Sequence, residues 1–246
     1  MSPADVGLTS GRRRRVRGLR REEVARLADV GVTWYTWLEQ GRAIVVSEEM
    51  LRRIAAALLL DSSETQYLRK LVRPAAKQPY LRDVGVDEAA RYLVERFDEG
   101  FAYLRNARFD WLAWNERFGR LQRLERHADG LERNALWRLF VDTRMRALVP
   151  SFDEYARRLV AAFRAEYAQY VGDRDFEDLI DALGSASWEF AALWAEHGVL
   201  SPAQWLAVGP IDLRDPDTGR VEPLKFDPLH MTLPHAPGQT TVYCIT

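Results

Sequence analysis

Apolar residues recur at helical spacing in several short segments near the start of the chain. Two of these segments predict helices over about residues 20–28 and 32–40, with apolar positions three or four residues apart. Asp29–Gly31 lies between them and predicts a tight turn, and Gly41 is placed to end the second helix. Two short helices joined by such a turn form a helix-turn-helix unit.

Two more helices are predicted in the segment that follows. Ser47 is a preferred helix-capping residue, and two glutamates come directly after it, where the helix dipole favours acidic side chains. Asp61 and Glu64 have the spacing of a capping box at the start of a fourth helix, which Pro74 ends. The pattern therefore predicts an all-helical domain over residues 1–73.

The pattern changes after this domain. Residues 74–79 hold two prolines and predict a linker, which is followed by a second domain over residues 80–246. Helical spacing predicts helices there over about residues 87–105, 112–126, 152–171, 174–184 and 187–197. Two runs near the end, residues 221–228 and 239–246, are bounded by turn sequences and predict strands. The second domain is therefore expected to mix α and β structure.

The net charge of −1 hides an uneven distribution. Residues 1–79 hold 15 Lys and Arg against 9 Asp and Glu, a balance of +6, whereas residues 80–246 hold 20 against 27, a balance of −7. Eight arginines lie within residues 12–26. A basic segment beside an acidic domain indicates a polyanionic partner for the first part, although a solvated charged surface would give the same counts.

Composition narrows the class of protein. A hydrophobic content of 47% over 246 residues is enough for a buried core. Cys244 is the only cysteine, so an internal disulfide or a multi-cysteine zinc site cannot form, which favours a reducing compartment. Neither a secretion signal nor an apolar run long enough to cross a bilayer is found. We therefore expect a cytoplasmic protein without membrane insertion.

The sequence offers little support for an enzyme. Its four histidines are far apart, and it lacks the His-Glu-x-x-His, Gly-x-Ser-x-Gly and phosphate-loop motifs. The acidic residues within 173–181 lack the histidine or glycine spacing of a metal loop, so they are interpreted as a solvated helix face. We expect no catalytic residue, no metal site and no cofactor.

The segment from Gly18 to Arg42 reads Gly-Leu-Arg-Arg-Glu-Glu-Val-Ala-Arg-Leu-Ala-Asp-Val-Gly-Val-Thr-Trp-Tyr-Thr-Trp-Leu-Glu-Gln-Gly-Arg. It resembles the phage-repressor (XRE) type of helix-turn-helix and, within that type, it is similar to the MmyB-like bacterial transcription regulators. Asp29 stands where the motif usually has a left-handed glycine, and Gly31 stands where a serine cap is usual. Both residue types tolerate these positions.

The resemblance also implies a further helix before the segment that corresponds to Ser2–Leu8, so the first helix of the domain is expected to be missing from this chain. A start assigned too far downstream would account for this, and so would a regulator that binds DNA weakly or with a partner. Residues 12–15 are expected to form a basic arm that adds nonspecific phosphate affinity.

The outward positions of the second predicted helix are expected to enter the major groove, where threonine can hydrogen-bond to base edges and apolar groups can meet a thymine methyl. These positions are Val32, Thr33, Thr36 and Trp37. Flanking arginines are expected to contact phosphates, which sets position without reading sequence. They are Arg20, Arg21 and Arg42. Glu39 is expected to pair with a basic residue, with Arg14 as one candidate.

Several motifs of the second domain look like the ligand-binding domain of the same regulators. They are Asn106-Ala-Arg-Phe-Asp-Trp-Leu-Ala-Trp-Asn115, Glu132-Arg-Asn134, Ser187-Trp-Glu-Phe190 with Leu193, Trp194 and His197, and Asp215-Pro-Asp-Thr-Gly219. In the last of these, Asp215 replaces a usual histidine. The resemblance implies a PAS-like α+β fold, with a curved sheet and flanking helices, and a fatty-acid-like ligand.

Aromatic side chains of the second domain are candidates for an apolar pocket. They are Phe101, Tyr103, Trp114, Phe118, Trp137, Phe140, Phe190 and Trp194. Ordinary core packing is the better explanation for any one of them taken alone. Arg133 is a candidate anchor for a carboxylate head, with a structural salt bridge as the alternative.

Together these features predict a sequence-specific, DNA-binding transcription regulator that responds to a small apolar ligand. A homodimer on double-stranded DNA is expected, because one short helix reads few base pairs. The alternative is a protein-interaction module that keeps the helix-turn-helix shape but no longer binds DNA on its own.

Overall fold

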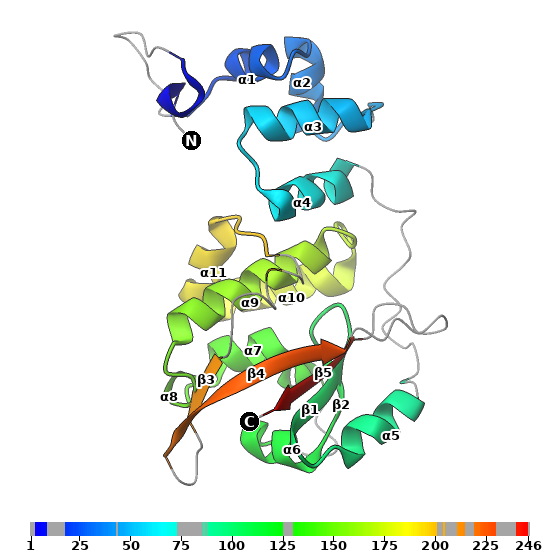
Figure 1. Ribbon diagram of the computed structural model, residues 1–246, viewed down its shortest axis with the longest axis vertical. Coiled ribbons are helices and arrows are strands. Elements are labelled where there is room, and N and C mark those ends of the chain that lie inside the picture. The colour runs from blue at the N-terminus through cyan, green and yellow to red at the C-terminus, as the bar shows by residue number, and fades with distance from the viewer. Residues whose placement is uncertain are drawn as a thin grey trace. The chain divides into compact units, whose positions relative to one another are not determined.

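A computed structural model describes residues 3–8, 18–42, 44–72, 86, 88–124, 130–200, 204, 211–214, 219–229 and 240–245. The chain forms two compact units, Met1–Ala76 and Lys77–Thr246, whose elements are labelled in Figure 1. Among the described helices, none is both long and apolar enough to cross a membrane.

The first unit is helical. Its elements are a 3-10 helix, η1 (Pro3–Val6), and the helices α1 (Arg21–Leu27), α2 (Val32–Glu39), α3 (Glu48–Ala57) and α4 (Ser62–Val72). The predicted cap of α3 is confirmed, because the Ser47 hydroxyl accepts a hydrogen bond from the Met50 amide at 3.1 Å. The predicted capping box is confirmed as well. The Glu64 amide donates to the Asp61 carboxylate at 2.8 Å, and the Asp61 amide donates to the Glu64 carboxylate at 2.9 Å.

The turn between α1 and α2 has the geometry expected from the sequence. Asp29 adopts a left-handed conformation with φ of 53°, and Gly31 is the extended residue that precedes α2. The Asp29 carboxylate also accepts a hydrogen bond at 2.9 Å from Arg53 of α3. The aspartate therefore adds a link to α3 that a glycine at this position cannot make.

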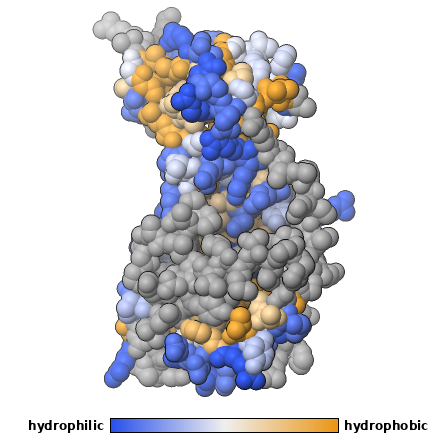
Figure 2. All heavy atoms as spheres, turned by 45° about the vertical axis from the view of Figure 1, so that its right-hand side comes forward, coloured by the Kyte–Doolittle hydropathy of each residue, from blue (hydrophilic) through white to orange (hydrophobic). Residues whose placement is uncertain are grey.

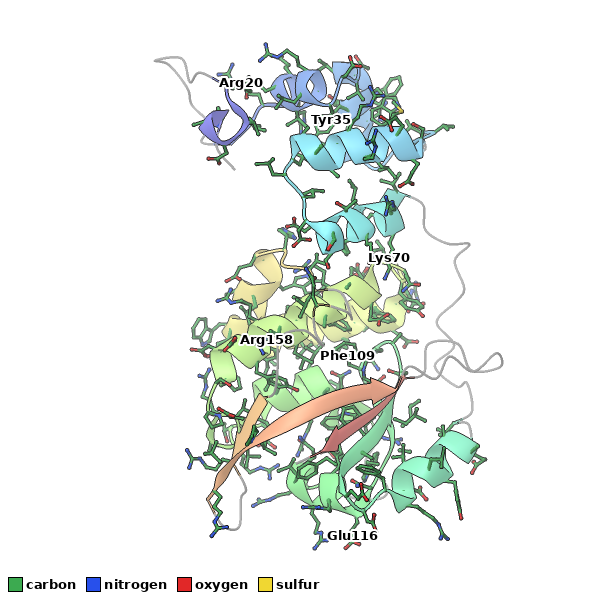
Figure 3. The ribbon with its side chains drawn as sticks, viewed as in Figure 1. Arg20, Tyr35, Lys70, Phe109, Glu116 and Arg158 are labelled. Atoms are coloured by element: carbon green, nitrogen blue, oxygen red, sulfur yellow. The ribbon has the colours of Figure 1, made fainter. Side chains whose placement is uncertain are left out.

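A small apolar core holds the first three long helices together. Val24, Ala25 and Ala28 of α1 and its cap pack with Tyr35 of α2 and with α3. Figure 3 shows Tyr35 between α2 and α3. Ala25 is completely buried, so a larger residue there would force the helices apart.

The second unit mixes helices with a sheet. Its helical elements are α5 (Glu88–Arg96), α6 (Glu116–Gln122), η2 (Gly130–Arg133), α7 (Ala135–Val141), α8 (Met145–Leu148), α9 (Phe152–Tyr167), α10 (Arg174–Ala186) and α11 (Trp188–Ala195). Its strands are β1 (Gly100–Arg105), β2 (Trp111–Trp114), β3 (Ile211–Arg214), β4 (Val221–Leu229) and β5 (Thr240–Ile245). The strands form one antiparallel sheet in the order β2-β1-β5-β4-β3.

The sequence prediction for this unit is right in part. The helices expected over 152–171, 174–184 and 187–197 correspond to α9, α10 and α11, and the two expected strands correspond to β4 and β5.

Two expected helices, over 87–105 and 112–126, are wrong for part of their length, because residues 100–105 and 111–114 are strands β1 and β2. β1 alternates between buried and partly buried residues, as a strand does, and it pairs with β5, which lies about 140 residues further on. The spacing of apolar residues within one segment cannot predict pairing with a strand so far along the chain.

Different elements cover the two faces of β1. Ala102 and Leu104 pack with Ala90 and Val94 of α5, and all four are at most 1% exposed. A larger apolar core joins α7, α8, α9, α10 and α11, with Phe163 and Phe176 stacked at 5.8 Å between ring centroids. Figure 1 shows the helices α9, α10 and α11 as a layer on one side of the sheet and α5 on the other.

Candidate functional sites

The exposed face of α2 is the face that the sequence predicted to point outward. Val32 is 44% exposed and Trp37 is 39% exposed, whereas Tyr35 on the opposite face is 5% exposed. Thr33 is also exposed. Apolar residues and hydrophilic residues share the visible surface of the first unit in Figure 2. The face therefore offers both apolar and hydrogen-bonding groups.

Thr36 lies on the same helix but is only partly exposed. Its hydroxyl donates a hydrogen bond to the main-chain oxygen of Val32 at 2.8 Å. With its proton used within the helix, the hydroxyl keeps lone pairs that can accept. In a major groove such a group would match the amino group of adenine or cytosine.

Arg42 follows the end of α2 and stays beside it. Its guanidinium carbon lies 5.9 Å from the centroid of the Trp37 ring, within the range of a cation–π interaction. Both side chains are exposed. The stacking positions a positive charge next to the exposed face of α2.

Arg21 connects α1 to α2. Its side chain donates to the carboxylate of Glu39, and this hydrogen bond raises the pKa of Arg21. Glu39 therefore pairs with Arg21, whereas the sequence named Arg14, which lies outside the described residues. The Arg21 guanidinium remains largely exposed, so its remaining N–H groups face solvent.

The other cations of this unit fall into two groups. The arginines of α3 and α4 face nearby acids: Arg52 pairs with Glu49, and Arg69 pairs with Glu48. Arg20, Arg26 and Arg42 are exposed, and among the described residues their guanidinium groups have no carboxylate within 4.0 Å. Arg26 was not singled out from the sequence. Uncompensated positive charge is thus concentrated near α1 and α2.

In the second unit, the Asn106–Asp110 motif builds the turn between β1 and β2. The Asn106 side chain donates to the Asp110 carboxylate at 3.1 Å and accepts from the Asp110 amide at 2.9 Å. The same carboxylate accepts from Arg108 and from Asn134. These residues stabilise the β1–β2 turn, and their polar side-chain groups bind one another.

Three other motif residues cap helices. Asn115 accepts from the Phe118 amide at the start of α6, Asn134 accepts from two amides at the start of α7, and Ser187 accepts from the Phe190 amide at the start of α11. All three are at most 6% exposed. Their side chains replace the missing main-chain partners of the first helical turn.

Phe109 sits in the same turn with a left-handed φ of 67°, which is unusual for a bulky residue. Its ring is 3% exposed and packs edge-on against Phe163 at 5.5 Å. Figure 3 shows Phe109 between the layer of α9 and the sheet. Core packing on this ring maintains the strained conformation.

Seven of the eight predicted pocket aromatics separate into two groups, and Trp114 lies apart from both, beside Arg133. Tyr103 and Phe118 pack at 4.6 Å between ring centroids, close to Trp111, which the sequence did not single out. Phe140, Phe190 and Trp194 form the second group within the helical core. Phe101 and Trp137 also pack against that core. Phe118 and Phe190 are buried, whereas the other six keep some exposed surface.

Arg133 lies against the second strand. Its guanidinium carbon is 5.3 Å from the Trp114 ring centroid, and its side chain donates to the main-chain oxygen of Leu112 at 3.2 Å. His197 faces Arg164, with Nη1 and Nδ1 3.5 Å apart. The predicted Asp215 turn lies outside the described residues, apart from Gly219.

Arg105, at the end of β1, is a charged residue that the sequence analysis missed. It lies on the face opposite Ala102 and Leu104, and burial lowers the pKa of its guanidinium. Alternation along β1 is the signal that identifies this face, but the segment was predicted as a helix.

Within the described ranges, no three histidine, cysteine or acidic residues are grouped so that they could hold a metal ion. Comparison with known families gives two matches. The MmyB-like transcription regulator ligand binding domain matches residues 86–246, and a helix-turn-helix domain matches residues 11–68. No curated protein matches the chain.

Proposed function

Because the chain belongs to the family of MmyB-like transcription regulators, we propose that it binds specific sites on double-stranded DNA and that a fatty-acid-like ligand in its second domain modulates this binding. The observation that carries the proposal is the exposed face of α2 with uncompensated arginines beside it. Residues 1–73, 74–79 and 80–246 would then be the DNA-binding domain, a linker and the ligand-binding domain.

The composition of the α2 face supports direct reading of bases. Val32 offers an apolar contact for a thymine methyl, Thr33 has an exposed hydroxyl, and Thr36 has free lone pairs. Arg20 and Arg42 are suited to phosphate contacts on either side. Arg21 would combine a phosphate contact with its structural link to Glu39.

The proposed state on DNA is a homodimer in the cytoplasm. One short helix reads few base pairs, and two copies bound to half-sites about 34 Å apart would supply the missing contacts. Both matching families are regulator domains, so a catalytic role is not part of the proposal.

The β1 face opposite α5 supports the ligand part of the proposal. Phe101, Tyr103 and Arg105 point to this side and stay partly exposed, although large side chains of the unit surround them. Ala102 and Leu104 on the other face are at most 1% exposed. An apolar molecule on the first face would remove the remaining aromatic surface from water.

The DNA part is tested by gel shift with the region upstream of the protein's own gene, at several salt concentrations. Arg42→Gln is expected to weaken binding to all sequences and to lower the log–log salt slope by about 0.9. Arg52→Gln is the matched control, because Glu49 already balances that charge. Failure of both this chain and an N-terminally extended version to bind in a salt-sensitive way would favour the protein-interaction alternative.

The ligand part is tested by extracting the purified protein with organic solvent and analysing the extract by mass spectrometry. A co-purified fatty acid, or an increase in melting temperature when fatty acids are added, is the expected result. If the extract holds no lipid and no fatty acid changes the melting temperature, the ligand part is wrong.

A further inference from the structure

Arg105 combines a charged group with an unusual position. It is the last residue of β1, beside a register irregularity between Leu104 and Arg105 in the pairing with β2. Leu104 pairs with Ala113 and Arg105 pairs with Trp111, so Leu112 is an extra residue in β2. Such a bulge redirects side chains and is common next to functional sites.

The contacts of the Arg105 guanidinium with described residues use few of its donors. One Nη1–H donates to the main-chain oxygen of Asn106 at 3.0 Å, and the guanidinium carbon lies 3.9 Å from the Phe109 ring centroid. Among the described residues, no carboxylate comes within 4.0 Å of this side chain. A guanidinium has five N–H donors, so the main-chain contact uses only a small part of its capacity.

Two other arginines of the second unit that are largely buried each have a carboxylate partner. Arg108 pairs with Asp110 at 3.1 Å, and Arg138 pairs with Asp142 at 3.1 Å, with both partners of each pair at most 15% exposed. Within the described ranges of the chain, no carboxylate pairs with Arg105 in this way. A guanidinium that loses water without gaining a carboxylate is unfavourable, and an anion would relieve this penalty.

Two side chains of α9 lie close enough to Arg105 to affect the pKa of its guanidinium. Burial lowers the pKa of Arg105, and Glu166 opposes this effect from a distance, together with Tyr103 and Tyr155. Tyr155 and Glu166 are three helical turns apart, so they lie on one side of α9, with Leu159 and Ala162 between them. Arg105 therefore lies near the side of α9 that carries Tyr155 and Glu166, and the residues between these two on that side are apolar.

Partial exposure is shared by several of these groups. Tyr103, Arg105, Tyr155 and Ala162 all keep some accessible surface, although Phe109, whose ring contacts Arg105, is 3% exposed. This is the arrangement that an amphipathic ligand requires, with one strong cation among aromatic and aliphatic groups.

We propose that Arg105 binds the carboxylate of the ligand and that the apolar chain lies between β1 and α9. This proposal rests on the ligand part of the proposed function. A guanidinium can hold a carboxylate with two parallel hydrogen bonds, which gives both strength and direction. Arg105 replaces Arg133 as the anchor, because Arg133 is engaged with Trp114 and with the Leu112 oxygen.

The test compares dodecanoate with dodecan-1-ol, which has the same chain but no carboxylate. Affinities for the full chain, freed of lipid, are measured by displacement of a fluorescent fatty-acid probe. Wild-type protein is expected to bind the acid about 10- to 100-fold more tightly than the alcohol, as befits a charged hydrogen bond in a partly buried site. Arg105→Met is expected to lose this preference while binding the alcohol within about threefold of wild type.

Two further variants control the comparison. Arg133→Met removes another partly buried arginine and is expected to keep the preference for the acid. Arg105→Lys retains the charge without the planar fork and is expected to keep part of the preference, which provides a readout if Arg105→Met fails to fold.

The outcomes separate the two levels of the proposal. Equal binding of acid and alcohol to wild type overturns the Arg105 anchor but leaves an apolar ligand in place. The anchor is also overturned if Arg105→Met keeps the preference or if Arg133→Met loses it. If wild-type protein binds neither molecule, the ligand part of the proposed function is wrong, and the anchor is wrong with it.

Discussion

Removing the Asn134 side chain should destabilise the second unit strongly, because one residue there joins two structural elements. The side chain is completely buried. Its oxygen accepts from the Leu136 and Trp137 amides at 3.0 and 3.1 Å, and its nitrogen donates to the Arg108 oxygen and the Asp110 carboxylate, both at 2.8 Å. Asn134→Ala therefore removes a helix cap and also a link to the β1–β2 turn.

The magnitude follows from these two roles. Loss of the cap costs about 0.5–2 kcal/mol. The Arg108 oxygen, left without its side-chain donor in a buried site, adds about 1–3 kcal/mol. The Asp110 carboxylate keeps its hydrogen bonds from Asn106 and Arg108, so losing the bond from Asn134 costs less there than at the Arg108 oxygen. We expect the free energy of unfolding to fall by about 2–4 kcal/mol in total.

The assay is urea unfolding followed by tryptophan fluorescence, to which Trp137 of α7 contributes directly. Ser187→Ala is the matched control, because Ser187 is also a buried cap but its side chain, among the described residues, makes only the hydrogen bond to the Phe190 amide, at 3.2 Å. It should cost about 1 kcal/mol. Asn134→Ser keeps a capping oxygen and should lie between the two. If Asn134→Ala costs no more than Ser187→Ala, the joint role of Asn134 is refuted.

Three other predictions concern single side chains. Burial, and then Glu39, raises the pKa of Tyr35 to about 12 from 10.0. The protein therefore keeps this contribution to stability below pH 10 and loses it as the pH rises to about 12, and Tyr35→Phe should flatten thermal stability across that window. Asp29→Gly removes an exposed ion pair with Arg53 but places an unstrained glycine in the left-handed conformation. The free energy of unfolding should therefore change by less than about 1 kcal/mol. A larger loss in urea unfolding would show that the ion pair contributes more than its exposure indicates. Gly119→Ala places a methyl group 2.9 Å from the Trp114 ring and should cost about 1–3 kcal/mol, with a changed near-ultraviolet circular dichroism spectrum. An unaltered spectrum would contradict the expected movement of the ring.

The helix-turn-helix unit could be predicted from the sequence because its signals are local. The cap at Ser47, the reciprocal pair of Asp61 and Glu64, and the left-handed Asp29 each act within a few residues, and each is confirmed. The outward face of α2 follows from helical spacing alone, once Tyr35 is placed inside. The DNA contacts of that face stay a prediction.

The candidate ligand site could not be predicted in the same way. The segment that contains β1 is rich in residues that also suit a helix, and its pairing with β2 and with the distant β5 makes it a strand. Once the segment is known to be a strand, alternation places Arg105 on the face opposite Ala102, but a helical reading of the same segment hides this. The motif asparagines were recognised from the family resemblance, but their work as caps appears only when α6 and α7 are in place.

The position of β5 between β1 and β4 affects the order in which the sheet can fold during synthesis. β1 can form a hairpin with β2 at once, but its other edge waits for a strand made about 140 residues later. At about 5–20 residues per second on the ribosome, this delay is roughly 7–28 s. The helices α1 to α4 are complete long before then. During translation, an open β1 edge and the side chains proposed to hold a lipid are exposed together, so nascent chains should depend on chaperones more than the helical unit alone.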